Sequence, residues 1–323
     1  MIITFYSTVS KESECLKYIP QIKEHTFRII RLDERKRLLS ECNDTEILVV
    51  DAMGTVDKEI IDSMPNLRLI HSEGVGYQGF DVSYASKKNI IVCNNKGIND
   101  TAVAEDALLL MLGCLKSIIT GHQSVYDGRQ IEVKKASFGV VRELGECTVG
   151  LVGFGDIARK TAELCNAFGA RVIYSNRTRY KELEEKYNVT YVSLDELLEQ
   201  SDFVSLHLAV TDDTREIADD EFFAKMKSTA YLINTSRGDL VNNEALLNAL
   251  LSGKISGAGL DVISPEPVKS DNILLDERIA DKLVLTPHIA GITHLTVKKL
   301  YLNIWDNVTR FMNSKPLKNI VSK

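Results

Sequence analysis

The sequence predicts an α/β protein with two doubly wound parallel-sheet domains, and three observations lead to this prediction. Short runs rich in β-branched residues alternate with helical patterns along the whole chain, which is typical of parallel sheets covered by helices. The chain has 323 residues, enough for two domains that each bury a core. A glycine-rich turn near residue 153 opens a second series of alternating elements.

Composition and charge exclude several classes of protein. With 44% hydrophobic and 26% charged residues, the chain is an ordinary globular protein rather than a disulfide-stapled miniprotein. Its 39 Lys and Arg against 45 Asp and Glu give a net charge of −6. Because the basic residues do not cluster, we expect no nucleic acid partner. The longest apolar run, Ala107–Leu115, is too short to span a bilayer, so we expect no membrane segment.

The cysteines and the first residues indicate a reducing compartment. The six cysteines form no C-x-x-C pair and mostly lie in apolar runs, where reduced structural thiols are the more common interpretation. The segment Met1–Tyr6 lacks the basic part of a signal peptide. We therefore expect a first strand at this segment and a cytoplasmic protein.

Five strands are expected in the first third of the chain. They are Ile2–Tyr6, Phe27–Leu32, Ile47–Asp51, Leu67–His71 and Ile90–Cys93. The next segment, Thr101–Ile119, has hydrophobic residues on all sides, which indicates a helix buried between domains or subunits. We expect a domain junction near residue 100.

The second series of elements predicts six strands. They are Thr148–Val152, Arg171–Ser175, Phe203–Leu208, Ala230–Asn234, Gly257–Val262 and Leu283–Thr286. Ser193–Glu196 fits a capping box, and Gly169 and Gly253 occupy positions typical of a residue just past a helix end. Beyond residue 290, hydrophobic residues recur at helical spacing, so an amphipathic helix should return to the first domain.

The segment from Thr148 to Ala158 is a strand, a tight turn and a helix start with the pattern G-x-G-x-x-A. Gly153 would allow the turn, and Gly155 would let the backbone approach a pyrophosphate at the helix N-terminus. Ala158 would permit close packing of helix on strand. The alternative, a glycine turn without a ligand, is weaker because the pattern opens an alternating series, the context that a dinucleotide site requires.

The position that reads the adenosine ribose falls at Asn176, Arg177 and Thr178, where no carboxylate is present. An acidic residue there would repel a 2′-phosphate, whereas Arg177, with Arg179 close by, offers positive charge. NADP is therefore favoured over NAD. The alternative is that both arginines are solvated surface residues.

Three polar residues follow late strands of the second series, where open α/β sheets place their sites. Arg237 can hold a carboxylate and a carbonyl bidentately. Glu266 and His288 can form a pair that relays a proton. Each residue alone is ambiguous, since an Arg before Gly, an acid between prolines and a His after a strand are often structural.

Several motifs together resemble the D-isomer-specific 2-hydroxyacid dehydrogenase family, in order and spacing, over almost the whole chain. They are Gly74-Val75-Gly76, Ala102-Val103-Ala104-Glu105, Gly153 to Ala158, Asn234-Thr235-Ser236-Arg237-Gly238, Gly259-Leu260-Asp261-Val262 with Glu266, and Thr286-Pro287-His288. The resemblance implies a Rossmann cofactor domain, residues 101–289, inserted into a flavodoxin-like substrate domain of residues 1–100 plus 290–323.

The resemblance also implies roles for single residues. Arg237 matches the substrate-clamping arginine, His288 the acid/base next to the nicotinamide, and Glu266 the carboxylate that holds the histidine. Val75 and Gly76 match the loop whose backbone amides take the substrate carboxylate, an anion nest. Further cofactor contacts are implied at Asp156, Ile157, Asn176, Leu208, Ala209, Thr214, Thr235 and Asp261, besides Gly153, Gly155, Arg177 and Thr178.

Two departures from the family pattern and the remaining histidines need separate interpretation. Ala209 replaces a proline, which loosens a turn. Glu73 either faces the substrate, where it would disfavour a second anionic group, or is solvated at the surface. His207 is interpreted as structural or cofactor-adjacent. No histidine has a metal-like partner spacing, so no metal site is predicted.

We therefore expect an NAD(P)-dependent oxidoreductase that interconverts a small 2-oxo acid and a D-2-hydroxy acid. The alternatives are a dinucleotide-sensing, corepressor-like interaction protein and a dehydrogenase of another substrate such as formate or phosphite. Glu266 argues against formate, because that branch typically has glutamine there. We expect the almost wholly apolar segment Ala107–Leu115 to be hard to bury within one subunit, which predicts a two-fold homodimer through that helix.

Overall fold

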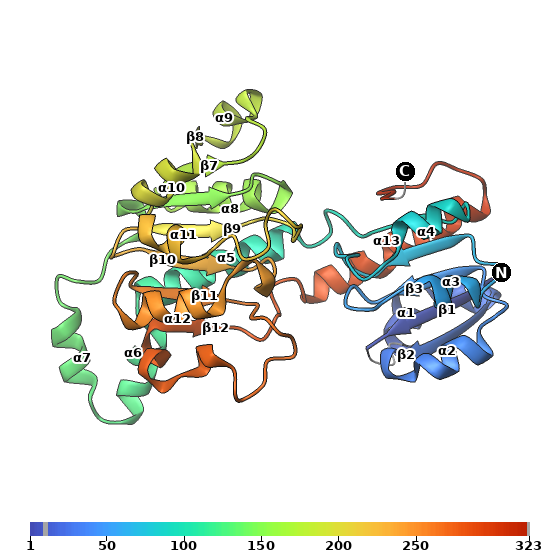
Figure 1. Cartoon of the computed structure of the whole chain (residues 1–323), viewed down its shortest axis with the longest axis horizontal. Helices are drawn as coiled ribbons and strands as arrows, with labels where there is room; N and C mark the ends of the chain where they lie inside the picture. The colour runs from blue at the N-terminus through green and yellow to red at the C-terminus, as the bar shows by residue number, and fades with distance from the viewer. Residues whose placement is uncertain (9–11, 322–323) are drawn as a thin grey trace. The chain divides into compact units, whose positions relative to one another are not determined.

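The computed structural model describes residues 1–8 and 12–321, and they form two compact units (Figure 1). Unit 1 consists of Met1–Asn99 and Thr293–Lys323, and unit 2 of Asp100–Ile292. One unit is thus made of both ends of the chain, and the other of its continuous middle.

Unit 1 contains a five-stranded parallel sheet with the order β2-β1-β3-β4-β5. This is the flavodoxin-like order, in which the order of successive strands across the sheet reverses between β1 and β3. All five predicted strands are present, with ends that differ by one or two residues. Their bounds are Ile2–Ser7 (β1), Thr26–Arg31 (β2), Ile47–Val50 (β3), Leu69–Ser72 (β4) and Ile91–Cys93 (β5).

Helices cover both faces of this sheet, and two separate apolar clusters form the core. The C-terminal helix packs Tyr301, Ile304 and Val308 into the cluster that contains Phe5 and Val49, so its amphipathic face is buried on the first sheet. The bounds are Glu12–Tyr18 (α1), Pro20–Glu24 (η1), Leu32–Glu34 (η2), Arg35–Glu41 (α2), Lys58–Asp62 (α3), Val82–Lys87 (α4) and His294–Met312 (α13), where η marks 3₁₀ helices.

Unit 2 contains a seven-stranded parallel sheet with the order β12-β11-β10-β9-β6-β7-β8. From β8 to β11 this is the Rossmann order, and β12 adds one further strand at the edge. The six predicted strands are present, and the seventh, β8, has only two residues, too few to give a periodic signal. The bounds are Thr148–Val152 (β6), Arg171–Ser175 (β7), Thr190–Tyr191 (β8), Phe203–Leu206 (β9), Tyr231–Asn234 (β10), Gly257–Leu260 (β11) and Leu283–Leu285 (β12).

The predicted helix punctuation of unit 2 is confirmed. Ser193 accepts a hydrogen bond from the Glu196 amide in a capping box, and Gly169 and Gly253 have φ of 82° and 69° just past their helices. The helices are Asp100–Leu115 (α5), Ile118–Tyr126 (α6), Gln130–Ser137 (α7), Leu144–Glu146 (η3), Asp156–Ala167 (α8), Lys181–Tyr187 (α9), Leu194–Gln200 (α10), Asp220–Lys225 (α11), Gly238–Leu240 (η4), Asn243–Leu251 (α12), Ile273–Leu275 (η5) and Glu277–Lys282 (η6).

The expectation that Ala107–Leu115 cannot be buried within one subunit is wrong. Most of these residues lie in the core of unit 2, in a cluster that also contains Leu151 and Ile233. The helix comes close to the sheet because β11 has a glycine there: a Cβ on Gly259 would lie 2.8 Å from the Leu110 Cβ. Leu109, 56% exposed, is the clear exception.

Exposed apolar side chains are instead found on α6, on α7 and on the segment just after α7, a region that projects from unit 2 (Figure 1). The most exposed of them are Val125, Tyr126, Ile131, Phe138 and Val140. The six cysteines are all free and buried. Within the described residues, no helix has the length and apolar character needed to cross a bilayer.

Candidate active site

The carboxyl edge of the seven-stranded sheet brings the predicted polar residues of unit 2 together. Arg237 follows β10, Glu266 follows β11 and His288 follows β12, three strands that are neighbours in the sheet. Parallel strands present their carboxyl ends at one edge, which explains why residues far apart in sequence converge.

His288 and Glu266 form a direct pair. The His288 Nδ1 lies 2.8 Å from Glu266 Oε2, so the carboxylate orients the ring and accepts the Nδ1 hydrogen. This hydrogen bond, opposed by partial burial, raises the pKa of His288 above its usual 6.5. The ring therefore favours the protonated form, and its Nε2 remains to donate a proton. The side chain is 39% exposed, which leaves that atom accessible.

The turn that carries His288 is held by the carboxylate of Asp261. His288 has a left-handed backbone with φ of 56°, a costly conformation for a residue other than glycine. Asp261 Oδ1 accepts the Thr286 hydroxyl at 2.7 Å and the Ile289 amide at 2.8 Å, and Oδ2 accepts the Ala290 amide at 3.0 Å. The resemblance gives Asp261 only as a cofactor contact, and its hold on this turn had no sequence signal.

Arg237 is a half-buried cation. Burial lowers the pKa of its guanidinium, while the nearby charge of Glu266 opposes that change. Its Nη1 donates to the Ser236 carbonyl at 2.7 Å, and Asn234 Nδ2 holds the Arg237 carbonyl at 2.8 Å. A fork with its charge only partly compensated is suited to binding an anion.

The glycine-rich turn has the geometry that a dinucleotide requires. Gly153 has φ of 94°, and a Cβ there would lie 2.5 Å from the His207 carbonyl oxygen. A Cβ on Gly155 would meet nothing within 4 Å, so open space lies over the N-terminus of α8. Ala158 is fully buried against the sheet. The residues present therefore fit a pyrophosphate at this helix end.

Further predicted cofactor contacts lie on the neighbouring loops. The Thr235 hydroxyl is buried and has no hydrogen-bond partner among the described residues, which is consistent with a missing ligand atom. Leu208 and Ala209 follow His207 beside the glycine turn, and the Thr214 hydroxyl donates to the Ala209 carbonyl at 2.6 Å. Asp156 and Ile157 begin α8, and Asp156 pairs with Arg159 at 3.2 Å.

At the predicted adenosine end the two arginines differ. Arg179 forms a two-point contact with Glu184, at 2.7 and 2.8 Å, and this lowers the pKa of that carboxyl. Arg177 is exposed and makes no ion pair within the described chain. The Asn176 side chain donates to the Thr178 carbonyl at 2.9 Å. Of these two arginines, Arg177 is thus the one that offers an uncompensated charge.

In unit 1, the loop Gly74–Gly76 follows β4. The Ser72 hydroxyl donates to the Gly76 carbonyl at 2.6 Å, and Asn94 Nδ2 donates to the Val75 carbonyl at 2.8 Å. These bonds fix the loop through its carbonyls. The amides of Val75 and Gly76 donate no hydrogen bond within residues 1–8 and 12–321, so neither is committed to an acceptor and both could donate to an anion.

Glu73, which precedes this loop, is not a solvated surface residue. It is 3% exposed, and its Oε2 accepts the Ser7 hydroxyl at 3.2 Å. Its carbonyl accepts Asn95 Nδ2 at 2.7 Å, and its amide donates to the Val50 carbonyl at 2.7 Å. Glu73 therefore connects the end of β4 to three other strand ends.

Two other histidines, His71 and His207, favour the neutral form. Burial lowers the pKa of His207 and of His71 to about 4. His207 Nε2 lies 3.0 Å from the Ser205 hydroxyl, and His71 Nε2 lies 3.0 Å from the Asn307 amide. In the part of the chain that the structure describes, no three His, Cys, Asp or Glu side chains gather as a metal site would require.

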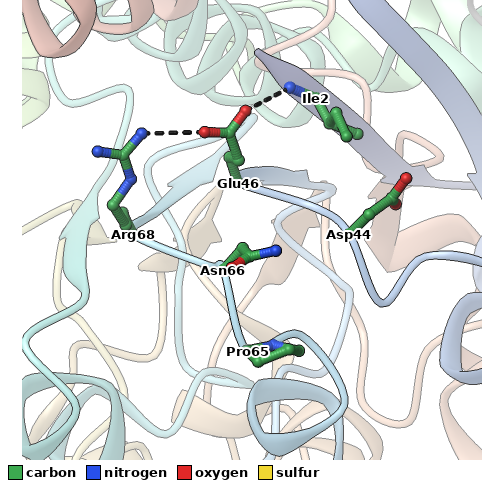
Figure 2. A pocket seen from close by; sticks show the side chains of 6 residues that line it. All are labelled: Ile2, Asp44, Glu46, Pro65, Asn66 and Arg68. Carbon is green, nitrogen blue, oxygen red and sulfur yellow. Dashed lines mark hydrogen bonds and ion pairs between the residues drawn. The ribbon is translucent and has the colours of Figure 1, made fainter.

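A cavity of about 590 Å³ in unit 1 lies away from the strand ends described above. Figure 2 shows its lining, which comes from the amino ends of the strands and includes Ile2, Glu46 and Arg68. Glu46 accepts hydrogen bonds from the Ile2 amide at 2.9 Å and from Arg68 at 3.0 Å. These polar groups satisfy one another, and α/β sites lie at the opposite sheet edge.

Comparison with known proteins adds to this geometry. The sequence profile of the D-isomer specific 2-hydroxyacid dehydrogenase, NAD binding domain, matches residues 108–290. The chain is 32% identical to a glyoxylate reductase of Korarchaeum cryptofilum (strain OPF8), over 94% of this chain and 92% of that one. It is 35% identical to a hydroxypyruvate reductase of Thermotoga maritima, over 93% and 94%. The crystal structure of a D-lactate dehydrogenase from Aquifex aeolicus, complexed with NAD and lactic acid, aligns with a TM-score of 0.83 and 28% identity over 99% of both chains.

Proposed function

Because this chain belongs to the D-isomer specific 2-hydroxyacid dehydrogenase family and is an NAD(P)-dependent oxidoreductase of 2-oxo acids, we propose that Arg237, Glu266 and His288 carry out the reduction. The observation that carries this proposal is the 2.8 Å contact between His288 and Glu266, close enough to Arg237 for their charges to interact. A proton donor and an anion-binding cation thus lie at one sheet edge.

In the direction of reduction, each residue has a separate task. Arg237 binds the substrate carboxylate and polarises the adjacent carbonyl oxygen. A nicotinamide cofactor held at the turn from Gly153 to Ala158 would supply the hydride to the carbonyl carbon. The electron pair of the C=O π bond moves to the oxygen, which takes the proton from His288 Nε2. Glu266 stabilises the imidazolium before that transfer, and the ring is neutral afterwards.

We infer that the substrate is a small 2-oxo acid. The relatives named glyoxylate reductase and hydroxypyruvate reductase support a short side chain. The amides of Val75 and Gly76, which donate no hydrogen bond among the described residues, are proposed to bind the substrate carboxylate. Glu73 is buried beside this loop, and an ionised Glu73 carboxylate would disfavour substrates with a further anionic group.

We propose that the enzyme prefers NADPH to NADH. Arg177 has no compensating carboxylate within the described residues, and no acidic side chain occupies the position of Asn176. A guanidinium can hold a 2′-phosphate through charge-assisted hydrogen bonds. Arg179 contributes less than the sequence suggests, because Glu184 already neutralises it.

A homodimer in the cytoplasm is proposed on two grounds. The exposed apolar side chains of α6, of α7 and of the segment just after α7, among them Tyr126 at 78% and Phe138 at 91% exposed, form a surface that a second copy would cover. All six cysteines are free, as a reducing compartment requires. Light scattering at micromolar concentration should give twice the chain mass of 36.1 kDa, and a single-chain mass would refute the dimer.

A turnover screen tests the proposed function. Glyoxylate, hydroxypyruvate, pyruvate and bulkier 2-oxo acids should be offered with NADH and with NADPH. We expect the highest kcat/KM for glyoxylate or hydroxypyruvate with NADPH. Absence of turnover with every 2-oxo acid would overturn the proposal, whereas turnover of pyruvate alone would correct only the substrate size.

A further inference from the structure

A buried carboxylate that the proposed mechanism does not use lies on α5. Asp106 is only 8% exposed, and its Oδ2 has no hydrogen-bond partner among the described residues. A buried ionised carboxylate is costly unless other groups compensate it. Asp106 therefore calls for a physical explanation.

The packing of α5 on the sheet places Asp106 near the end of β11. A Cβ on Gly259 would lie 2.8 Å from the Leu110 Cβ, so these two positions are in contact. Asp106 precedes Leu110 by one helical turn, and Asp261 follows Gly259 by two residues. Asp106 interacts with Asp261 and Thr286, so the N-terminal half of α5 lies at the carboxyl ends of β11 and β12. Asp106 and Asp261 thus approach each other from helix and strand.

The Thr286 hydroxyl belongs to the same cluster. It donates to Asp261 Oδ1 at 2.7 Å. Burial and the charge of Asp261 raise the pKa of Asp106 to about 6, and a hydrogen bond from Thr286 opposes this rise. A hydroxyl has one hydrogen, so it can serve only one of two ionised carboxylates at a time.

Protonation of Asp106 resolves this competition. A protonated Asp106 can donate to the Thr286 oxygen while the Thr286 hydroxyl donates to Asp261. All three groups are then satisfied, and only one negative charge stays in the cluster. An ionised Asp106 repels Asp261 instead, in surroundings that screen charge poorly.

We propose that Asp106 is a positioning residue for His288. In its neutral form it completes a chain through Thr286 to Asp261, the residue that holds the turn at positions 286–290, and in its ionised form it loosens that turn. The inference rests on the proposed role of His288 and adds a second group that controls its placement.

Few other titratable groups face Asp106. On α5 and the elements packed against it, Asp261 is the charged group that acts on Asp106 directly. Cys114 on α5 and Cys165 on α8 are buried thiols, and burial raises the pKa of each to about 12, so both stay neutral. His288 interacts with Asp261 through charge, and Glu266 acts on His288.

Thermal unfolding against pH tests the buried proton. The folded protein holds the Asp106 proton up to a pH of about 6, whereas the unfolded chain releases it near 3.8. The contribution of Asp106 to stability should therefore fall as pH rises through this window and stay lower above it, and the difference between wild type and Asp106→Asn isolates it from other titrating groups. Asp106→Asn lacks this fall, so its Tm should exceed that of the wild type at pH 8. Glu105→Gln, on the exposed side of the same helix, is the matched control and should follow the wild type.

An NMR titration of the histidine rings in the full chain tests the positioning role. The His288 signal, assigned by its loss in His288→Gln, should show its own titration and a second inflection near pH 6. Asp106→Asn should remove only the second inflection, and Thr286→Val should move it to higher pH because a hydrogen bond that favours ionisation is lost. Identical His288 curves in wild type and Asp106→Asn would overturn the inference, as would a lower Tm of that variant at every pH.

These measurements need no turnover. If the His288 signal responds to Asp106 but no 2-oxo acid is reduced, the proposed function fails and the coupling of the two residues stands. If turnover is found and the His288 signal ignores Asp106, the inference fails and the proposed function stands.

Discussion

Two histidines at the carboxyl edge of the same sheet have opposite electrostatics. His207 directly follows β9 and contacts a serine hydroxyl, and burial lowers its pKa to about 4. His288 follows β12 and contacts Glu266, and this hydrogen bond raises its pKa above 6.5. Both rings occupy strand ends, so position alone does not make a proton donor.

The two rings differ in the side chains that surround them. Glu266 comes from a separate loop and supplies a negative charge that the imidazolium needs, whereas Ser205 is neutral. His288 also lies beside Arg237, the cation that can hold a substrate. The following predictions test this contrast, starting with the largest expected effect.

Removal of the cation should cost the most. Arg237→Ala loses two charge-assisted hydrogen bonds of roughly 1.5–3 kcal/mol each, so kcat/KM should fall by about 10²–10⁴-fold. Circular dichroism and cofactor affinity should stay near wild type. Steady-state kinetics check this, with Arg278→Ala, an exposed arginine paired within its own turn, as the control. Near-normal kcat/KM in Arg237→Ala would rule out its role as the anion site.

Matched substitutions compare the two histidines directly. A general acid contributes about 10²–10⁴-fold, so His288→Gln should reduce kcat by that factor. His207→Gln removes a neutral ring and should change kcat much less. If His207→Gln were the more damaging variant, the assignment of the two rings would have to be reversed.

The two arginines after β7 extend the same contrast between paired and unpaired charges. Arg177→Ala should raise KM for NADPH about tenfold or more, because a charge-assisted hydrogen bond is lost, with little effect on NADH. Arg179→Ala should matter less, since Glu184 already holds that side chain. Asn176→Asp should reverse the preference by repelling the phosphate. A wild-type kcat/KM higher with NADH would contradict the proposed preference.

The smallest effect concerns stability in acid. The folded state resists protonation of His207 down to a pH of about 4, while the unfolded chain takes up that proton near 6.5. The contribution of His207 to stability should therefore be lost as pH falls through this window, and it is read as the difference between wild type and variant. His207→Gln should flatten that loss in thermal melts. His288 has the opposite sign, because its raised pKa favours the folded state at low pH. A His207→Gln variant with the wild-type acid slope would show that His207 is solvated.

Much of the fold follows from sequence patterns that are local. The strands of both sheets, the capping box at Ser193 and the glycine helix ends obey short-range rules. The burial of Ala107–Leu115 does not, because it depends on Gly259, some 150 positions away in the chain. The sequence shows that Ala107–Leu115 is apolar, but it does not show which residues cover that segment.

The candidate site divides in the same way. The motifs identify Arg237, Glu266 and His288, because sheet topology brings their strand ends together. The hold of Asp261 on the His288 turn and the burial of Glu73 depend on side-chain contacts between distant segments. No spacing rule contains that information.

The pH dependence of carbonyl reduction tests the central claim most directly. Wild-type kcat/KM for glyoxylate should fall as pH rises through the raised pKa of His288, since the neutral ring cannot donate a proton. Glu266→Gln removes the charge that raises this pKa, so the same fall should occur at lower pH. A pH profile that is identical in wild type and Glu266→Gln would mean that a group other than the His288–Glu266 pair supplies the proton.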